Sequence, residues 1–130
     1  MNKEIAKKWY QQALHDLDIA EKNLSIEGYD IAAFLAHQSI EKLFKGILIL
    51  EGKGAPKTHN LERLAELLDL PSTISDAVLE FIEDYTFSRY PDASIDLPYL
   101  QYDLEISKSK VGNAKMVFEA LKERCKELVE

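Results

Sequence analysis

The sequence predicts an all-α protein: an up-and-down helical bundle of three long and two short helices, formed by a single domain over residues 1–130. Three observations favour this fold class. Apolar residues recur at three- and four-residue steps through long segments, which is the period of a helix face. The chain has only 5 Gly and 4 Pro, whereas an all-β domain needs many turns. A hydrophobic share of 46% is enough to build one core.

The first two helices are expected to form an antiparallel hairpin. A helix is predicted over about residues 3–26 because its apolar residues share one face: Ile5, Trp9, Ala13, Leu17, Ala20 and Leu24. Glu27 and Gly28 interrupt this pattern, and Asp30 is the expected N-cap of a second helix that continues to about Glu51. Because the break is short, the two helices should run in opposite directions.

Two short helices are expected next. A loop over residues 52–58, GKGAPKT, precedes a helix that contains Leu61, Leu64, Leu67 and Leu68 and is ended by Pro71. Ser72 or Thr73 is the expected cap of the following helix. Its predicted apolar face consists of Val78, Leu79, Ile82 and Tyr85.

The last long helix is expected to begin near Pro98, a residue favoured in a first turn, and to run close to the C-terminus. Its apolar stripe consists of Tyr102, Ile106, Ala114, Val117, Leu121, Cys125 and Leu128. Residues 86–98 contain two prolines and have no helical period, so they are expected to form an ordered loop.

The second helix carries a polar stripe in an unusual setting. Gln38, Glu41, Lys42 and Lys45 follow one another at helical spacing. Apolar residues surround this stripe on almost every side of the helix, and such a helix is normally buried. We therefore expect the stripe to lie in a cleft or an interface. The alternative is a Glu41–Lys45 ion pair on a solvated face.

Two loops contain residues that are candidates to join the stripe. His59 follows Thr58 just before the first short helix, although either residue could instead cap that helix. Arg89, Tyr90 and Asp92 place the only arginine of residues 64–123 beside an aromatic ring and a carboxylate. The alternative is that Arg89 pairs with Asp92 while Tyr90 packs on the bundle. Loops carry function more often than core helices do, so both segments are included in the candidate site.

The charge distribution leaves room for a small phosphate site. The net charge of −7 argues against general binding of nucleic acid, which depends on Lys and Arg. The charge is unevenly distributed, however, since residues 42–57 have a local charge of +3 and residues 62–92 a local charge of −6. Any phosphate site is therefore expected on the side of the second helix and its following loop.

Several classes of site are excluded by the motifs. In GKGAPKT, Pro56 stands where a phosphate-binding loop needs glycine. His37 and Glu41 lie four residues apart, but two ligands do not make a metal site, so neither a metal nor a cofactor is predicted. The lone Cys125 is expected to fill the core. No signal peptide or membrane span is expected, which predicts a cytoplasmic protein.

Several of these residues together resemble a known family, the HEPN domain (higher eukaryotes and prokaryotes nucleotide-binding). The resemblance lies in Trp9, Ala13, Asp16, Leu17 and Ala20, then Gly28, Tyr29 and Phe34, then the polar stripe, then Thr58, His59, Leu61 and Leu64, and finally Arg89 to Asp92. It spans nearly the whole chain. It implies an all-α bundle that forms homodimers. It also implies a stand-alone prokaryotic protein that acts with a minimal nucleotidyltransferase as the toxin-like half of a toxin–antitoxin pair.

Ribonuclease members of that family carry an arginine followed four to six residues later by a histidine. Here the histidines are His15, His37 and His59, whereas the arginines are Arg63, Arg89 and Arg124, so every histidine precedes every arginine. The motif is therefore absent at any spacing, no catalytic residue is assigned, and the protein is expected to be no ribonuclease of the usual family type.

The leading hypothesis is a catalytically silent homodimer that binds a nucleotide, an RNA phosphate or a nucleotidyltransferase partner. Its candidate binding residues are Gln38, Glu41, Lys42, Lys45, His59, Arg89, Tyr90 and Asp92. Lys45 and Arg89 would contact phosphate, and Tyr90 would stack on a base. Two alternatives stay open. One is a ribonuclease toxin in which His59 and Arg89 form a rearranged site, and the other is a purely structural dimerisation module.

Overall fold

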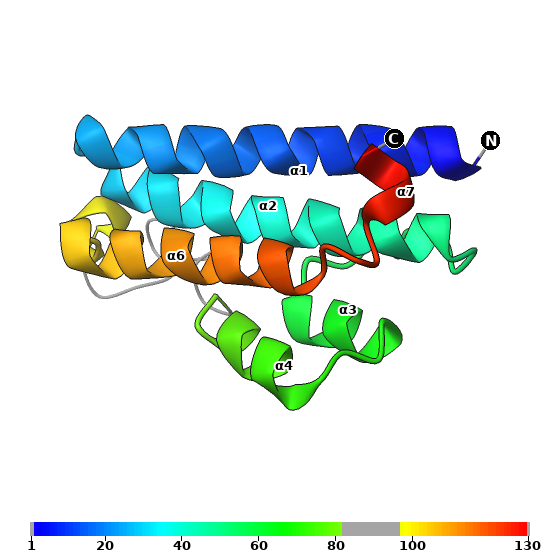
Figure 1. The fold of residues 1–130 in the computed structure, drawn as a ribbon. Helices are drawn as coiled ribbons and strands as arrows, with labels where there is room; N and C mark the ends of the chain where they lie inside the picture. Colours follow the sequence, from blue (N-terminus) through cyan, green and yellow to red (C-terminus); the bar gives the residue numbers. More distant parts are fainter. Residues whose placement is uncertain (1, 82–96, 130) are drawn as a thin grey trace.

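The computed structural model describes residues 2–81 and 97–129, and every regular element within them is helical (Figure 1). The long helices are α1 (Asn2–Ser25), α2 (Tyr29–Leu50) and α6 (Leu104–Ala120). The short ones are α3 (Leu61–Leu67), α4 (Ser72–Leu79), the 3₁₀ helix η2 (Pro98–Gln101) and α7 (Lys126–Val129). The predicted all-α bundle is confirmed.

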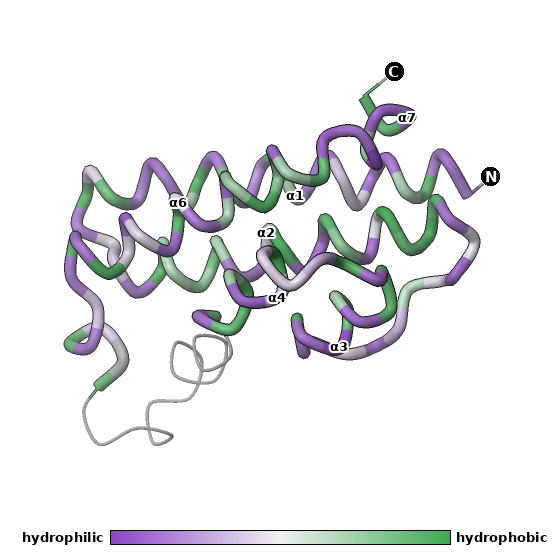
Figure 2. The backbone as a smooth tube through the Cα atoms, turned by 60° about the horizontal axis from the view of Figure 1, so that its bottom comes forward, coloured by the Kyte–Doolittle hydropathy of each residue, from purple (hydrophilic) through white to green (hydrophobic). Residues whose placement is uncertain are grey.

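The helix α2 is the central element of the bundle. It packs against α1, α3, α6 and η2. In Figure 1, α1 and α2 run antiparallel as a hairpin, while α6 lies along both of them in the direction of α2. The short α3 and α4 lie across α2 from α1, and α7 turns back to contact α1. Figure 2 shows hydrophilic and hydrophobic residues alternating along α1 and α6, as expected of helices that bury one face.

Small residues allow α1 and α2 to approach closely. Ala6, Ala13 and Ala20 recur every seven residues along α1 and are fully buried. On α2, a Cβ atom added at Gly46 would lie 3.3 Å from the backbone oxygen of Ala6, which leaves almost no room for a side chain. The predicted stripe is wrong at Ile5, which is exposed, because the helix turns its alanines rather than its largest residues toward α2.

The residues expected to cap the N-termini of α2, α3 and α4 differ from the N-caps in the structure. Gly28 is the N-cap of α2, and Asp30 lies in its first turn. Asn60 caps α3 by accepting a hydrogen bond of 3.1 Å from the backbone N–H of Arg63. That assignment removes the capping alternative for Thr58 and His59. Pro71, rather than Ser72 or Thr73, is the N-cap of α4, since the extended conformation before the helix suits a proline.

The predicted apolar face of α4 is confirmed only in part. Val78 is fully buried, whereas Leu79 is exposed and the following turn buries Phe81 instead. Ile82 and Tyr85, together with most of the predicted loop over residues 86–98, lie outside the described residues.

The single C-terminal helix predicted from Pro98 is in fact three elements. Asp103 caps α6 by accepting from the N–H of Ile106 at 2.8 Å, and Ile106 itself is exposed while Val111 is buried. After α6, the chain turns before α7. Arg124 holds this turn, because its guanidinium donates to both carboxylate oxygens of Glu51 and to the backbone oxygen of Leu68 at 2.7 to 3.0 Å.

The close approach of α1 and α2 predicts that their interface tolerates no added volume. Replacing Ala13 by leucine should lower the free energy of unfolding by about 1–3 kcal/mol, because the inserted methylenes force the two helices apart. Gln11→Leu adds a leucine at an exposed position of the same helix and should change the free energy of unfolding by less than about 0.5 kcal/mol. Urea unfolding followed by circular dichroism measures both. Equal effects of the two substitutions would contradict this account of the interface.

Candidate functional site

The polar stripe of α2 is divided between two networks inside one chain. Glu41 and Lys45 are buried, with side chains only 5% and 6% exposed, and Lys42 is 25% exposed. Their burial comes from α1 and from the loop before α3. The stripe is thus covered by other parts of the same chain, and the alternative of a solvated Glu41–Lys45 pair is wrong. The prediction that the stripe lies in a cleft or an interface stays a prediction.

The carboxylate of Glu41 is the centre of the first network. Lys45 Nζ donates to its Oε2 at 3.0 Å, and His59 Nδ1 lies 3.0 and 3.1 Å from its two oxygens. Because an ionised carboxylate only accepts hydrogen bonds, Nδ1 is a nitrogen of His59 that carries a proton. The His59 side chain is 54% exposed, so the ring is anchored to Glu41 while much of its surface meets solvent.

Lys45 has a second partner on α1. Its ammonium nitrogen lies 5.8 Å from the centroid of the Trp9 ring, within the range of a cation–π interaction. Lys45 is thus enclosed between a carboxylate and an indole. It is a fixed positive charge paired with the Glu41 carboxylate, and its side chain is only 6% exposed.

Lys42 belongs to the second network, which also links α2 to α1. Its ammonium donates to one carboxylate oxygen of Asp16 at 2.5 Å, while Gln12 Nε2 donates to the other at 2.9 Å. The Asp16 side chain is only 7% exposed. The half-buried Gln38 lies one turn before Glu41 and Lys42 on α2.

Arg89, Tyr90 and Asp92 lie outside the described residues. Their convergence with the stripe therefore stays a prediction. Of the candidate binding residues, the structure brings together Glu41, Lys45 and His59, and it directs Lys42 to the neighbouring network.

His37 lies one turn before Glu41 and is fully enclosed, at 1% exposure. Burial lowers its pKa to about 4, since desolvation outweighs the opposing influence of the Glu41 carboxylate. His37 is therefore neutral at pH 7. Within residues 2–81 and 97–129, no three His, Cys, Asp or Glu side chains form a group that could hold a metal ion. Cys125 is buried as predicted, and desolvation raises the pKa of its thiol to about 11.

Sequence reasoning missed part of the site, on α1. A shallow pocket of about 200 Å³ is lined by Lys8, Trp9, Gln12 and Lys42, directly beside the Lys45 contact. The available signal was Asp16, a carboxylate on the face of α1 that is otherwise apolar, because a buried acid needs a cationic partner.

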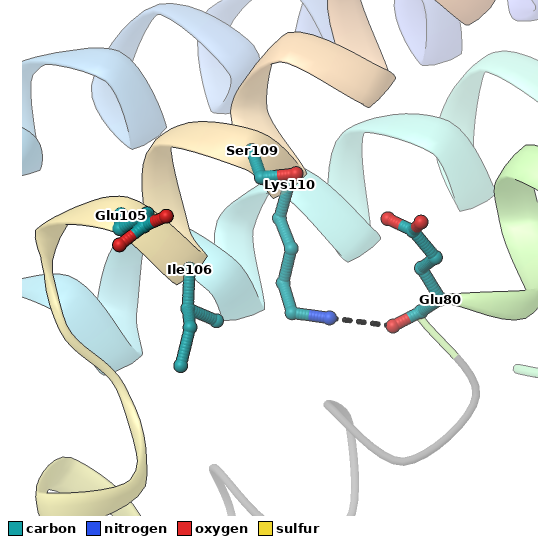
Figure 3. Close-up of a pocket in the computed structure, with 5 residues that line it drawn as sticks. All are labelled: Glu80, Glu105, Ile106, Ser109 and Lys110. Atoms are coloured by element: carbon teal, nitrogen blue, oxygen red, sulfur yellow. Dashed lines mark hydrogen bonds between the residues drawn. The ribbon is translucent and has the colours of Figure 1, made fainter.

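A larger pocket of about 440 Å³ lies elsewhere, between the end of α4 and the start of α6 (Figure 3). Its lining residues are Glu80, Glu105, Ile106, Ser109 and Lys110. Figure 3 shows Lys110 reaching toward the backbone oxygen of Glu80, to which it donates a hydrogen bond of 2.5 Å. Lys110 thereby links α6 to the end of α4. None of the residues that line this pocket belongs to the predicted polar stripe.

The fold and the buried ion cluster define a small all-α bundle protein, and comparison with known proteins identifies its family. The model of the HEPN domain matches residues 6–126, so the chain belongs to the HEPN family. A comparison with curated proteins gives no match. None of the helices in the described part of the chain is long and apolar enough to span a membrane.

Two solved structures are similar over almost their whole length. The crystal structure of TT1696 from Thermus thermophilus has 27% sequence identity and a TM-score of 0.84, and the match covers 95% of this chain and 99% of that one. The structure of ST0689, an archaeal HEPN homologue, has 29% identity and a TM-score of 0.78, with 91% and 95% of the two chains covered. The resemblance noted in the sequence is thus confirmed.

Removing the Glu41 carboxylate should destabilise the fold, because the buried Lys45 depends on it as a partner. Glu41→Ala leaves a buried ammonium without its carboxylate and should lower the free energy of unfolding by about 3–5 kcal/mol. Replacing both residues by leucine should restore much of the loss, because no unpaired charge remains. Asp18→Ala, which removes the exposed Asp18–Lys22 pair of α1, should cost less than about 1 kcal/mol in the same urea titration. A comparable loss in the two single variants would refute the buried-pair account.

The lowered pKa of His37 predicts a stability that depends on pH. Since the folded-state pKa of about 4 lies below the unfolded value near 6.5, the stabilising contribution is complete above that value and is lost as the pH falls toward 4. The contribution amounts to about 3 kcal/mol between pH 7 and pH 4. Urea unfolding at pH 7 and pH 4 measures how much the free energy of unfolding falls between the two. For His37→Gln this fall should be smaller than in wild type by that amount, whereas His15→Gln, at an exposed site on α1, should show the same fall as wild type.

Proposed function

We propose that this HEPN protein is a cytoplasmic phosphate-binding module that holds a nucleotide or an RNA phosphate beside α2. The observation that carries the proposal is the meeting of Glu41 and Lys45 on α2 with His59 in the loop before α3, which together form one hydrogen-bonded cluster. When the His59 ring carries a proton on both nitrogens, its Nδ1–H stays on Glu41 and its Nε2–H can donate to an anionic ligand.

The residues of the cluster have different roles in the proposed binding site. Lys45 supplies a fixed positive charge that Glu41 already engages. His59 and Lys42 are more exposed than Glu41 and Lys45, and the exposed Lys57 adds positive charge to the loop that contains His59. Lys53 is engaged elsewhere, since it pairs with Glu51 and donates to the backbone oxygen of Leu67. In the proposal, Gln38 contributes its amide from the same helix, and Arg89, Tyr90 and Asp92 complete the site around the ligand.

Family membership supports the proposed partners. We propose that the protein acts as a homodimer and pairs with a minimal nucleotidyltransferase in a toxin–antitoxin-like system. Lys42, Lys45 and Lys53 of the locally basic segment over residues 42–57 are paired with carboxylates of this chain, and the exposed Lys57 offers a contact for an acidic partner. The acidic segment over residues 62–92 offers a contact for a basic partner.

One observation favours a second function, cleavage of RNA at a rearranged site. Glu41 orients His59 through Nδ1, and in the neutral ring with its proton on Nδ1 the basic nitrogen is Nε2. Carboxylate-oriented imidazoles of this kind act as general bases. Nε2 would take the proton of a ribose 2′-hydroxyl as its oxygen attacks the adjacent phosphate, and the 5′-oxygen would leave with a proton from water, which yields a 2′,3′-cyclic phosphate and a 5′-hydroxyl. Arg89 would stabilise the phosphate charge in this alternative.

Calorimetric titration with ATP, GTP and a short RNA tests the leading function. Wild type should bind at least one of them, and His59→Ala should weaken binding about tenfold, because a hydrogen bond to a charged phosphate is lost. His15→Ala changes an exposed histidine of α1 and should leave the affinity unchanged.

Absence of binding at millimolar ligand would overturn the phosphate-binding function. Cleavage of the RNA in EDTA that His59→Ala abolishes would favour the second function instead. If every ligand assay is blank while Glu41→Ala shifts the dimer–monomer balance in sedimentation, the protein is the structural dimerisation module.

A further inference from the structure

The pocket on α1 adds a second half to this site. We infer that Trp9 is a stacking platform for the base of the nucleotide or single-stranded RNA whose phosphate the α2 cluster holds. This inference rests on the proposed function and specifies the ligand: a phosphate that carries an aromatic base, rather than inorganic phosphate or a sugar phosphate.

The size of the pocket suits one aromatic ring system. Its volume of about 200 Å³ is below the roughly 300–1,000 Å³ of sites that enclose a whole drug-sized molecule. The pocket is shallow and lies along α1, so a ligand would rest on its floor and extend from it. A base stacked on one side chain, with its phosphate outside, fits such a shape.

The ring of Trp9 is fixed before any ligand arrives. The indole is half-buried between α1 and α2, and the Lys45 ammonium lies 5.8 Å from its centroid. Lys45 is in turn held by Glu41. A platform that is already ordered binds with little loss of conformational freedom, which favours affinity. The chain Trp9–Lys45–Glu41–His59 also makes the platform continuous with the proposed phosphate cluster.

The rim of the pocket has the polarity that a nucleotide requires. Lys8 is exposed on one side of Trp9, and Lys42 stands on α2 with its ammonium on Asp16. Asp16 accepts from both Lys42 and Gln12 and is only 7% exposed, so Lys42 and Asp16 form a neutral pair and the exposed Lys8 supplies the positive charge of the rim. Gln12 turns its amide nitrogen to Asp16, and the amide oxygen is then an acceptor for an N–H group on the edge of a base.

Two larger pockets lack this combination. The pocket between α4 and α6 and a pocket of about 410 Å³ near the C-terminus are both lined by lysine and glutamate. No aromatic ring is among the described residues that line either of them. The C-terminal pocket, with Lys122 and Lys126, therefore provides a matched control for positive charge without a stacking surface.

The fluorescence of the protein reports this subsite directly, because Trp9 is the only tryptophan of the chain. We expect ATP or hexa-adenylate to quench the emission and inorganic tripolyphosphate to leave it unchanged. In calorimetry, Trp9→Leu should weaken ATP binding about tenfold while leaving tripolyphosphate binding unchanged, and Trp9→Phe should retain most of the affinity. Lys8→Ala should weaken ATP binding, and Lys122→Ala should not.

The outcomes separate the two proposals. ATP or hexa-adenylate that binds in calorimetry without quenching, and with equal affinity for Trp9→Leu, would overturn the stacking platform and leave the phosphate cluster standing. Failure of all three probes to bind would overturn both. If Trp9→Leu does not fold by circular dichroism, the wild-type quenching and the Trp9→Phe affinity decide the question.

Discussion

A carboxylate removed from water organises the middle of this molecule. Burying the charge of Glu41 is costly unless it is paired, and the chain supplies two partners, Lys45 from the next turn of α2 and His59 from the loop before α3. Lys45 can be buried for the same reason, and it extends the network to Trp9 on α1. One acidic side chain thus links the first helix, the second helix and the following loop.

This arrangement depends on how closely α1 and α2 pack. The alanine heptad of α1 and the glycine at position 46 let the two backbones approach until the Trp9 ring reaches Lys45. Asp16, two turns further along α1, then meets Lys42. The same contact surface therefore produces both networks, and the polar groups within it hydrogen-bond to one another.

The networks also change how the candidate site works. The sequence pattern made Lys45 a phosphate ligand, but its ammonium is engaged on two sides. The more exposed His59 and Lys42 are better placed to meet a ligand, and the pocket beside Trp9 gives that ligand a surface to lie on. Preorganised charge of this kind favours binding because little has to move when the ligand arrives.

Local pattern alone determined the long helices, the hairpin of α1 and α2 and the family resemblance, because helical periodicity and short breaks are properties of neighbouring residues. The pairing of Glu41 with Lys45 was also readable, since both lie one turn apart on one helix. Only the tertiary structure decided that His59 joins Glu41, that Lys42 turns to Asp16 and that Trp9 borders a pocket. Those contacts join segments whose separation in the sequence has no period, and the hydrogen bonds of Arg124 to Glu51 and Leu68 have the same origin. Long-range contacts of this kind are set by packing, and no local spacing encodes them.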